Sequence, residues 1–187
     1  MASNGHLERR VVQYQQLWAP WRLAYIQGDS LPSEGEPLEF LPGADASCFL
    51  CQSAVSRQDR PRLVVGRSEH CVLVLNRYPY NNGHVLVSPK RHVARLDQLS
   101  DAEHLDLSRQ VAATVSLLEE TLHPEGFNVG LNLGKVAGAG LPGHIHWHIV
   151  PRWNGDTNFM PAIAGVKVIP QALESLWEAL TQARRFP

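Results

Sequence analysis

The feature that most constrains this 187-residue chain is a run in which histidine alternates with apolar residues, Gly143-His144-Ile145-His146-Trp147-His148-Ile149-Val150. Side chains alternate between the two faces of a β-strand, and neighbours on one face stand about 6.7 Å apart. The run therefore predicts a strand that carries His144, His146 and His148 on one face and apolar residues on the other. A single histidine would suggest a structural role, but three in alternation indicate chemistry.

Short apolar runs elsewhere predict further strands, which begin near Leu63, Cys71, His84 and Phe127. The segment Ser100-Asp101-Ala102-Glu103 has the form of a capping box and predicts a long helix over roughly residues 100–122. Pro170 precedes an amphipathic helix predicted over residues 171–184. Strands on both sides of one long helix predict an α+β fold with an antiparallel sheet of about five strands.

The first part of the chain has a different composition from the rest. Residues 28–47 carry several glycines and prolines among acidic and small residues, which is typical of a linker. We therefore expect an N-terminal arm and linker over residues 1–47 and one domain over residues 48–187.

Charge and hydropathy narrow the classes of partner and location. The formal net charge is −1, and the basic residues are spread along the chain, which argues against nucleic acid as the main partner. No apolar run approaches the ~20 residues that a membrane span requires. The first residues lack the basic-then-apolar pattern of a secretory signal, so we expect a cytoplasmic protein without a membrane anchor.

Two cysteines, Cys48 and Cys51, stand in a C-x-x-C spacing that can place both thiolates on one metal ion. The spacing alone is weak, because it also fits a redox pair or two small buried residues. A closed tetrahedral site would need two further ligands. The third cysteine, Cys71, lies inside a predicted strand and is expected in the core.

A glycine-rich loop over residues 132–143 comes directly before the histidines. Glycines allow backbone N–H groups to approach phosphate oxygens closely, and Lys135 could add a positive charge. Such loops usually only connect strands, but this one adjoins three imidazoles. A neutral imidazole is a competent nucleophile toward phosphorus, and a second imidazole can assist the leaving group.

The segment from His144 to Val150 fits the motif His-φ-His-φ-His-φ-φ, in which φ is apolar. Together with Asn76–Pro79, Gly83–His92 and Asn128–Gly130, it makes the chain resemble the histidine-triad superfamily over roughly residues 48–160. The resemblance implies the α+β fold of that family. It also implies a homodimer whose interface contains the long helix and an edge strand.

Two flanking segments, Leu17–Arg22 and Pro151–Phe159, resemble the branch that acts on diadenosine polyphosphates, including bacterial diadenosine tetraphosphate phosphorylases. The resemblance implies cleavage of a diadenosine polyphosphate or related adenylyl substrate through a covalent nucleotidyl-histidine on His146. It implies that His148 contacts phosphate and assists the leaving group. His144 would fix the strand or serve a metal.

The same resemblance implies a set of substrate-binding residues, with Asn76 at the ribose and Trp153 shaping the pocket. The full set is Asn76, His84, Asn132, Gly138, Ala139, Gly140 and Trp153. It also completes the cysteine pair with two histidines into a structural zinc site that fastens the N-terminal segment to the strand of His146. The four implied ligands are Cys48, Cys51, His92 and His144.

Several alternatives stay open at this point. Phosphorylases of this branch carry a Gly-Ser pair where this chain has Ala139-Gly140, so the second step could use water or inorganic phosphate. The histidines could instead bind a catalytic metal, with Asp156 as the nearest acid after the triad. A nucleoside phosphoramidase and a non-catalytic nucleotide-binding regulator are further possibilities.

Overall fold

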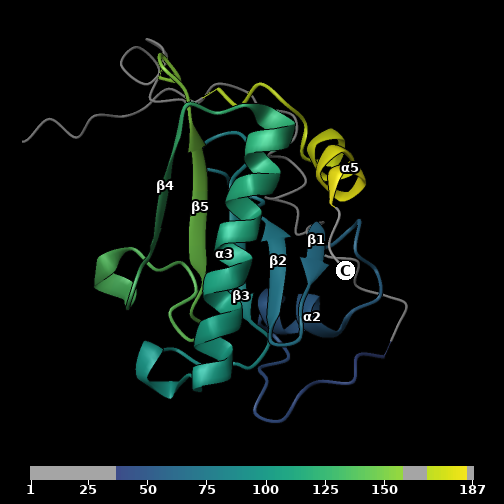
Figure 1. The fold of residues 1–187 in the computed structure, drawn as a ribbon. Coiled ribbons are helices and arrows are strands. Elements are labelled where there is room, and N and C mark those ends of the chain that lie inside the picture. Colours follow the sequence, from purple (N-terminus) through teal and green to yellow (C-terminus); the bar gives the residue numbers. More distant parts are fainter. Residues whose placement is uncertain (1–36, 158–167, 185–187) are drawn as a thin grey trace, which may run out of the picture.

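The computed structural model describes residues 37–157 and 168–184 (Figure 1). Five antiparallel strands form one sheet in the order β1-β2-β3-β5-β4. The strands are β1 Val64–Arg67, β2 Cys71–Leu75, β3 Val85–Pro89, β4 Gly126–Leu131 and β5 Trp147–Arg152. The helices are α2 Phe49–Val55, α3 Asp101–Leu122 and α5 Leu173–Ala183, with short 3-10 turns η1 Leu96–Gln98 and η2 Lys135–Ala137. The predicted α+β fold is confirmed.

Helix α3 lies across one face of the sheet and covers β2, β3 and β5 (Figure 1). Its inward side chains, including Leu118, are fully buried against a core to which the central strands contribute Val85, Ile149 and the predicted core residue Cys71. Burial of such side chains contributes about 1.5–3 kcal/mol each. The core therefore holds β5, which carries His148, between β3 and β4.

The start of α3 is the predicted capping box. Ser100 is the N-cap, its hydroxyl accepts a hydrogen bond from the Glu103 backbone N–H, and the Glu103 carboxylate accepts one from the Ser100 N–H. Arg91 reaches the same carboxylate from beyond the end of β3, at 2.8 Å. This one carboxylate therefore joins the first turn of the helix to the segment that follows β3.

Helix α2 was not predicted. It has seven residues, Cys48 is its N-cap, and Leu50 is fully buried where the helix packs on β2. Isolated helices of this length are unstable in water, so contacts with the rest of the protein must maintain it. The C-x-x-C pair thus lies at the start of a helix that tertiary structure alone stabilises.

The two ends of the sheet differ. Helix α5, predicted over residues 171–184, lies beside the edge strand β1 (Figure 1), with Leu176 and Leu180 buried. Strand β4 forms the other end and, within the described residues, pairs only with β5. None of the described helices combines the length and apolar character that a membrane crossing requires.

The histidine strand begins later than predicted. We expected a strand from His144, but β5 starts at Trp147. The preceding residues bond elsewhere: the Ile145 N–H donates to the Val93 carbonyl at 2.7 Å, and the Ser88 hydroxyl donates to the Ile145 carbonyl at 2.8 Å. These residues therefore lie outside the strand ladder. The arm and linker lie mainly outside the described residues, so the domain boundary at residue 47 stays a prediction.

The Glu103 carboxylate predicts a pH-dependent stability. Hydrogen bonds from Arg91, reinforced by Ser100, lower the pKa of Glu103 to about 2. A lowered pKa in the folded state stabilises the protein above the unfolded value near 4.5, and this contribution is lost as the pH falls toward 2. We expect Glu103→Gln to lower the free energy of unfolding by about 2 kcal/mol at pH 7 and by much less at pH 3.

Urea unfolding of the two proteins at both pH values measures this difference. Asp97→Asn is the matched control, because Asp97 forms an exposed ion pair with Arg95 on η1 and should change stability little at either pH. An equal loss for Glu103→Gln at pH 7 and pH 3 would contradict the assignment.

Candidate functional site

The structure separates the three histidines of the motif into two clusters. His146 and His148 lie in one cluster, with ring centroids 4.9 Å apart, and His84 joins them 5.1 Å from His148. His144 lies in the other cluster, where its ring meets that of His92 at 4.9 Å. His144 and His146 therefore belong to different clusters although only one residue separates them.

A backbone hydrogen bond determines which nitrogen of His146 carries the proton. Its Nδ1 lies 2.8 Å from the His144 carbonyl oxygen, which can only accept, so Nδ1–H donates. Burial lowers the pKa of His146 although this bond opposes the shift, so the ring is neutral near pH 7. The lone pair of a neutral ring must then be on Nε2. His146 therefore presents an unprotonated nitrogen on the side away from its own backbone.

A chain of hydrogen bonds gives His148 the opposite arrangement. The Tyr80 backbone N–H donates to Nδ1 of His84 at 3.0 Å, so the proton of His84 is on Nε2. That nitrogen donates to Nδ1 of His148 at 2.9 Å, which leaves the proton of His148 on Nε2. Burial lowers the pKa of His84 to about 3 and that of His148 to about 4, so both rings are neutral.

The Nε2–H of His148 is buried and has no hydrogen-bond partner among the described residues. A buried donor without a partner costs about 1–3 kcal/mol and is often found where a ligand supplies the acceptor. Next to it, His146 offers a free Nε2. The pair can thus provide a nucleophile and a hydrogen-bond donor to one phosphoryl group.

Tyr80 is a site residue that sequence reasoning missed. Besides its backbone N–H, its ring lies 5.6 Å from that of His148 in a stacked arrangement and 4.8 Å from that of His84. The Tyr78-Pro79-Tyr80 segment has the composition of a turn. No local pattern indicates that the Tyr80 N–H would bond the ring of His84, 4 residues later, and so decide which nitrogen carries its proton. The half-exposed tyrosine ring therefore packs against His84 and His148.

The second cluster has the composition of a metal site. The ligand atoms of Cys48, Cys51, His92 and His144 all lie within 4.8 Å of one another. The Cys48 Sγ and His144 Nδ1 are 3.3 Å apart, and the Cys51 Sγ and His92 Nδ1 are 3.2 Å apart. A tetrahedral zinc site has S···N edges of about 3.6 Å. The four predicted ligands therefore fit one ion.

Two further observations agree with a metal in this position. Nε2 of His144 lies 2.8 Å from the Pro89 carbonyl oxygen and must donate to it, which leaves the lone pair of Nδ1 directed at the cysteines. Burial raises the pKa of Cys48 to about 11, so a thiolate there requires a nearby cation. His144 is fully buried and serves this cluster rather than the pair of His146 and His148.

The structure places the predicted ribose residue, Asn76, beside the histidines. Its amide nitrogen lies 3.1 Å from Nδ1 of His84, and its oxygen accepts from the Tyr78 backbone N–H. His84 itself is only 1% exposed and lies behind His148, not at a surface. Both residues therefore support the pair of His146 and His148.

The predicted phosphate loop follows β4. The Asn132 amide lies 3.5 Å from the Gly138 carbonyl, and Gly138 has a φ of +90°, a conformation that favours glycine. Ala139 is buried, whereas Gly140 and Lys135 are exposed. The loop has the glycine conformation expected, but its predicted contacts with phosphate stay a prediction.

The Trp153 indole makes its hydrogen bond away from the histidines of the site. Its indole donates to the His123 carbonyl at the end of α3, and the ring lines a depression of about 370 Å³ with Asn81, Asn82 and neighbours. No histidine of the site lines this depression. Its role in substrate binding stays a prediction.

Asp156, the acid considered for a catalytic metal, is engaged elsewhere. Arg152 forms a two-pronged ion pair with it, and the Asn81 amide donates to the same carboxylate at 2.8 Å. Among the described residues the only metal-competent cluster is the one at Cys48 and Cys51, which contains no carboxylate. The geometry therefore does not favour a metal-dependent hydrolase.

Comparisons with known proteins agree with the site. The HIT domain family matches residues 57–155. An AP-4-A phosphorylase of Mycobacterium tuberculosis is 41% identical over 86% of this chain and 80% of its own length. An adenosine 5'-monophosphoramidase of Schizosaccharomyces pombe is 27% identical over 72% of this chain and 96% of its own length.

Among solved structures, a Zn-bound histidine triad family protein from Mycobacterium smegmatis superimposes with a TM-score of 0.59. It is 28% identical to this chain, and the match covers 73% of this chain and 92% of that protein. The chain therefore resembles a protein in which a zinc ion has been observed.

The hydrogen bonds predict a specific distribution of ring protons near pH 7. His146 should carry its proton on Nδ1, the less common arrangement, whereas His84 and His148 should carry theirs on Nε2. Long-range ¹H–¹⁵N correlation spectra of the ¹⁵N-labelled protein distinguish the two forms. The exposed His104 is an internal reference for a ring exchanging between both forms. A proton on Nε2 of His146 would contradict the assignment of the nucleophile.

Proposed function

The chain belongs to the HIT family, named for its histidine triad, and on that premise we propose that it cleaves dinucleoside polyphosphates through a covalent nucleotidyl-histidine on His146. The substrate class is supported by the relative named AP-4-A phosphorylase, which matches most of this chain. The observation that carries the mechanism is the different position of the ring proton in two neighbouring histidines. His146 carries it on Nδ1 and has a free Nε2, whereas His148 carries it on Nε2.

In the first displacement, Nε2 of His146 attacks the α-phosphorus and forms a P–N bond, and the P–O bond to the distal nucleotide breaks with its electron pair. The ring becomes an imidazolium whose Nδ1–H still donates to the His144 carbonyl, and this contact stabilises the positive charge. His148 donates its Nε2–H to a phosphoryl or leaving oxygen, where negative charge develops.

In the second displacement, an oxygen nucleophile attacks the same phosphorus, and the P–N electron pair returns to His146 as a neutral ring. Water would yield AMP and release one proton, whereas inorganic phosphate would yield ADP. The main proposal covers transfer of the adenylyl group to either acceptor, water or inorganic phosphate. Ala139 and Gly140 bear on the choice, because they offer no hydroxyl to a second phosphate.

We propose that the cluster of Cys48, Cys51, His92 and His144 holds a structural zinc ion. Four protein ligands complete a tetrahedral shell and leave no open position for substrate, which is the pattern of structural sites. The ion would fasten α2 to the segment that precedes β5. No reaction step above uses it.

The assembly and location of the protein are also proposals. A homodimer is supported by β4, an edge strand whose central residues Asn128 to Gly130 include the 44% exposed Val129. We propose pairing of two copies at this edge and a cytoplasmic location. The predicted absence of a nucleic acid partner is supported by the net charge of −1.

The first test concerns His146. We expect His146→Ala to lower the rate of diadenosine tetraphosphate cleavage by at least about 10⁴-fold while nucleotide binding stays measurable, because only the nucleophile is removed. Product analysis with and without inorganic phosphate identifies the acceptor, and intact mass spectrometry detects an added adenylyl group on the wild-type protein. His104→Ala, at an exposed position, is the matched control. Normal turnover by His146→Ala would refute the mechanism.

A second test concerns the metal. We expect the purified protein to contain one zinc ion per chain and Cys51→Ser to lose it and unfold at a lower temperature, because a ligand of the cluster is missing. Elemental analysis and thermal unfolding measure the two effects. Cys71→Ser is the matched control, since Cys71 is equally buried but outside the cluster and should leave the zinc content unchanged. Zinc retained in full by Cys51→Ser would contradict the ligand set.

A further inference from the structure

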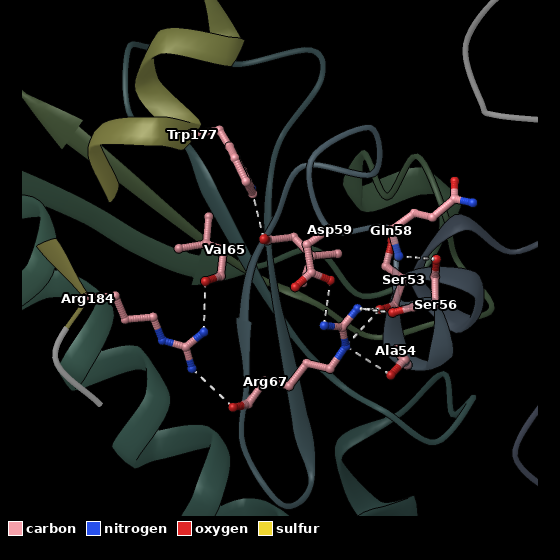
Figure 2. A network of polar contacts seen from close by, with 10 residues as sticks. Ser53, Ala54, Ser56, Gln58, Asp59, Val65, Arg67, Trp177 and Arg184 are labelled. Atoms are coloured by element: carbon pink, nitrogen blue, oxygen red, sulfur yellow. Dashed lines mark hydrogen bonds and ion pairs between the residues drawn. The ribbon is translucent and has the colours of Figure 1, made fainter. Parts of the chain in front are cut away.

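The far end of α2, the helix that carries both cysteines, is held by one arginine of the edge strand. The guanidinium of Arg67 donates to three backbone carbonyls and to one carboxylate (Figure 2). The acceptors are the carbonyls of Ser53 at 2.7 Å, Ala54 at 3.1 Å and Ser56 at 2.6 Å, and the Asp59 carboxylate at 2.7 Å. This side chain thus bonds two carbonyls in the last turn of the helix and the carbonyl of its C-cap, Ser56.

The last carbonyls of a helix have no partner within the helix, and they carry the negative end of its dipole. Helix α2 has no basic residue of its own in its last turn, so Arg67 supplies both the hydrogen bonds and the positive charge. Backbone hydrogen bonds join the two ends of this seven-residue helix, from the Ser56 N–H to the Gln52 carbonyl and from the Gln52 N–H to the Cys48 carbonyl. Fixing its end therefore fixes Cys48 and Cys51 at its start.

Trp177 of α5 and Arg184, the residue that caps the end of this helix, in turn hold the strand to which Arg67 belongs. Arg184 donates to the carbonyls of Val65 at 2.7 Å and Arg67 at 3.0 Å, and the Trp177 indole donates to the Val64 carbonyl at 2.8 Å (Figure 2). These carbonyls lie along the outer edge of β1, where no further strand follows in the described sheet. Side chains of α5 replace the missing strand.

The backbone of β1 is shaped for this contact. A Cβ atom at Gly66 would lie 0.8 Å from Nη1 of Arg184, so only glycine leaves room for the guanidinium. The register of β1 against β2 also shifts between Val64 and Gly66. Such a bulge turns additional carbonyls toward the edge.

We propose that Arg67 is a positioning residue for the metal site, and that α5 acts on the site through it. The inference rests on the metal site of the proposed function. Arg67 contacts none of the four ligands directly in the bonds described; it fixes the helix that carries two of them. The C-terminal helix, far along the chain from the cysteines, thereby controls how firmly the metal is retained.

The test measures zinc release from the zinc-loaded full chain into an excess of a chromophoric chelator. We expect Arg67→Gln to release zinc at least about tenfold faster, the range in which residues that support metal ligands act. Arg67→Lys should release zinc at a rate between those of the wild type and Arg67→Gln. Its ammonium group keeps the positive charge but cannot bond several carbonyls in a fixed geometry. Arg95→Gln, at an exposed arginine paired with Asp97, is the matched control and should release zinc at the wild-type rate.

The coupling to α5 is tested with Arg184→Gln, alone and combined with Arg67→Gln. The single variant should release zinc faster than wild type by a smaller factor. If α5 acts through Arg67, the double variant should release zinc no faster than Arg67→Gln alone. Multiplying effects would overturn the part of the proposal that concerns α5.

Hydrogen exchange distinguishes positioning from general destabilisation. In Arg67→Gln, the amides of Gln52 and Ser56, which bond within α2, should lose protection while those of the middle of α3 keep theirs. Equal loss in α3, or unchanged zinc release, would overturn the proposal. Neither measurement uses turnover, so a protein that fails to cleave the nucleotide still tests it. A wild-type chain that binds no zinc would refute both this inference and the proposed zinc site.

Discussion

The residues His144 and Ile145, just before β5, are held by hydrogen bonds outside the strand ladder. The Ile145 N–H bonds Val93, the Ser88 hydroxyl bonds the Ile145 carbonyl, and the His144 ring donates to Pro89. All three partners lie at or just beyond the end of β3. Because these bonds fix the backbone before β5 begins, they also fix the carbonyl of His144, which determines the protonation of His146. The reactive geometry is thus a property of the junction between two strands.

This short segment contributes His144 to the cluster with Cys48, Cys51 and His92, and it leads directly into the pair of His146 and His148. His144 turns toward the cysteines and His146 toward His148, although only one residue separates them. A zinc ion bound at His144 would restrict the backbone whose carbonyl accepts from His146. The two clusters therefore have distinct side chains but are joined through the main chain.

Much of this arrangement could be predicted from the sequence. The capping box at Ser100 located α3, because a local hydrogen-bond pattern defines its start, and apolar spacing located α5. The four metal ligands followed from the family resemblance, and the structure brings them together. Helix α2 escaped prediction because its seven residues contain no local signal beyond Cys48, and distant side chains stabilise it.

Other features depend on contacts that no local pattern encodes. The alternation of histidines predicted a common face, but it did not show that His144 would contact His92 while His146 contacts His148. The protonation of His148 depends on the backbone of Tyr80, which reaches it through His84. Sequence periodicity reports which face a side chain prefers. It does not report which nitrogen of an imidazole faces a donor.

Gly66 has a consequence for how this protein can change over time. Since any side chain at this position would occupy the place of the Arg184 guanidinium, a substitution there would move the arginine away from the carbonyls of Val65 and Arg67. A change at position 66 would therefore remove this docking contact even if Arg184 were kept, because its guanidinium would have to swing out of place. The two residues, separated by most of the chain, thus serve one contact, in which the glycine leaves empty the space that the arginine fills.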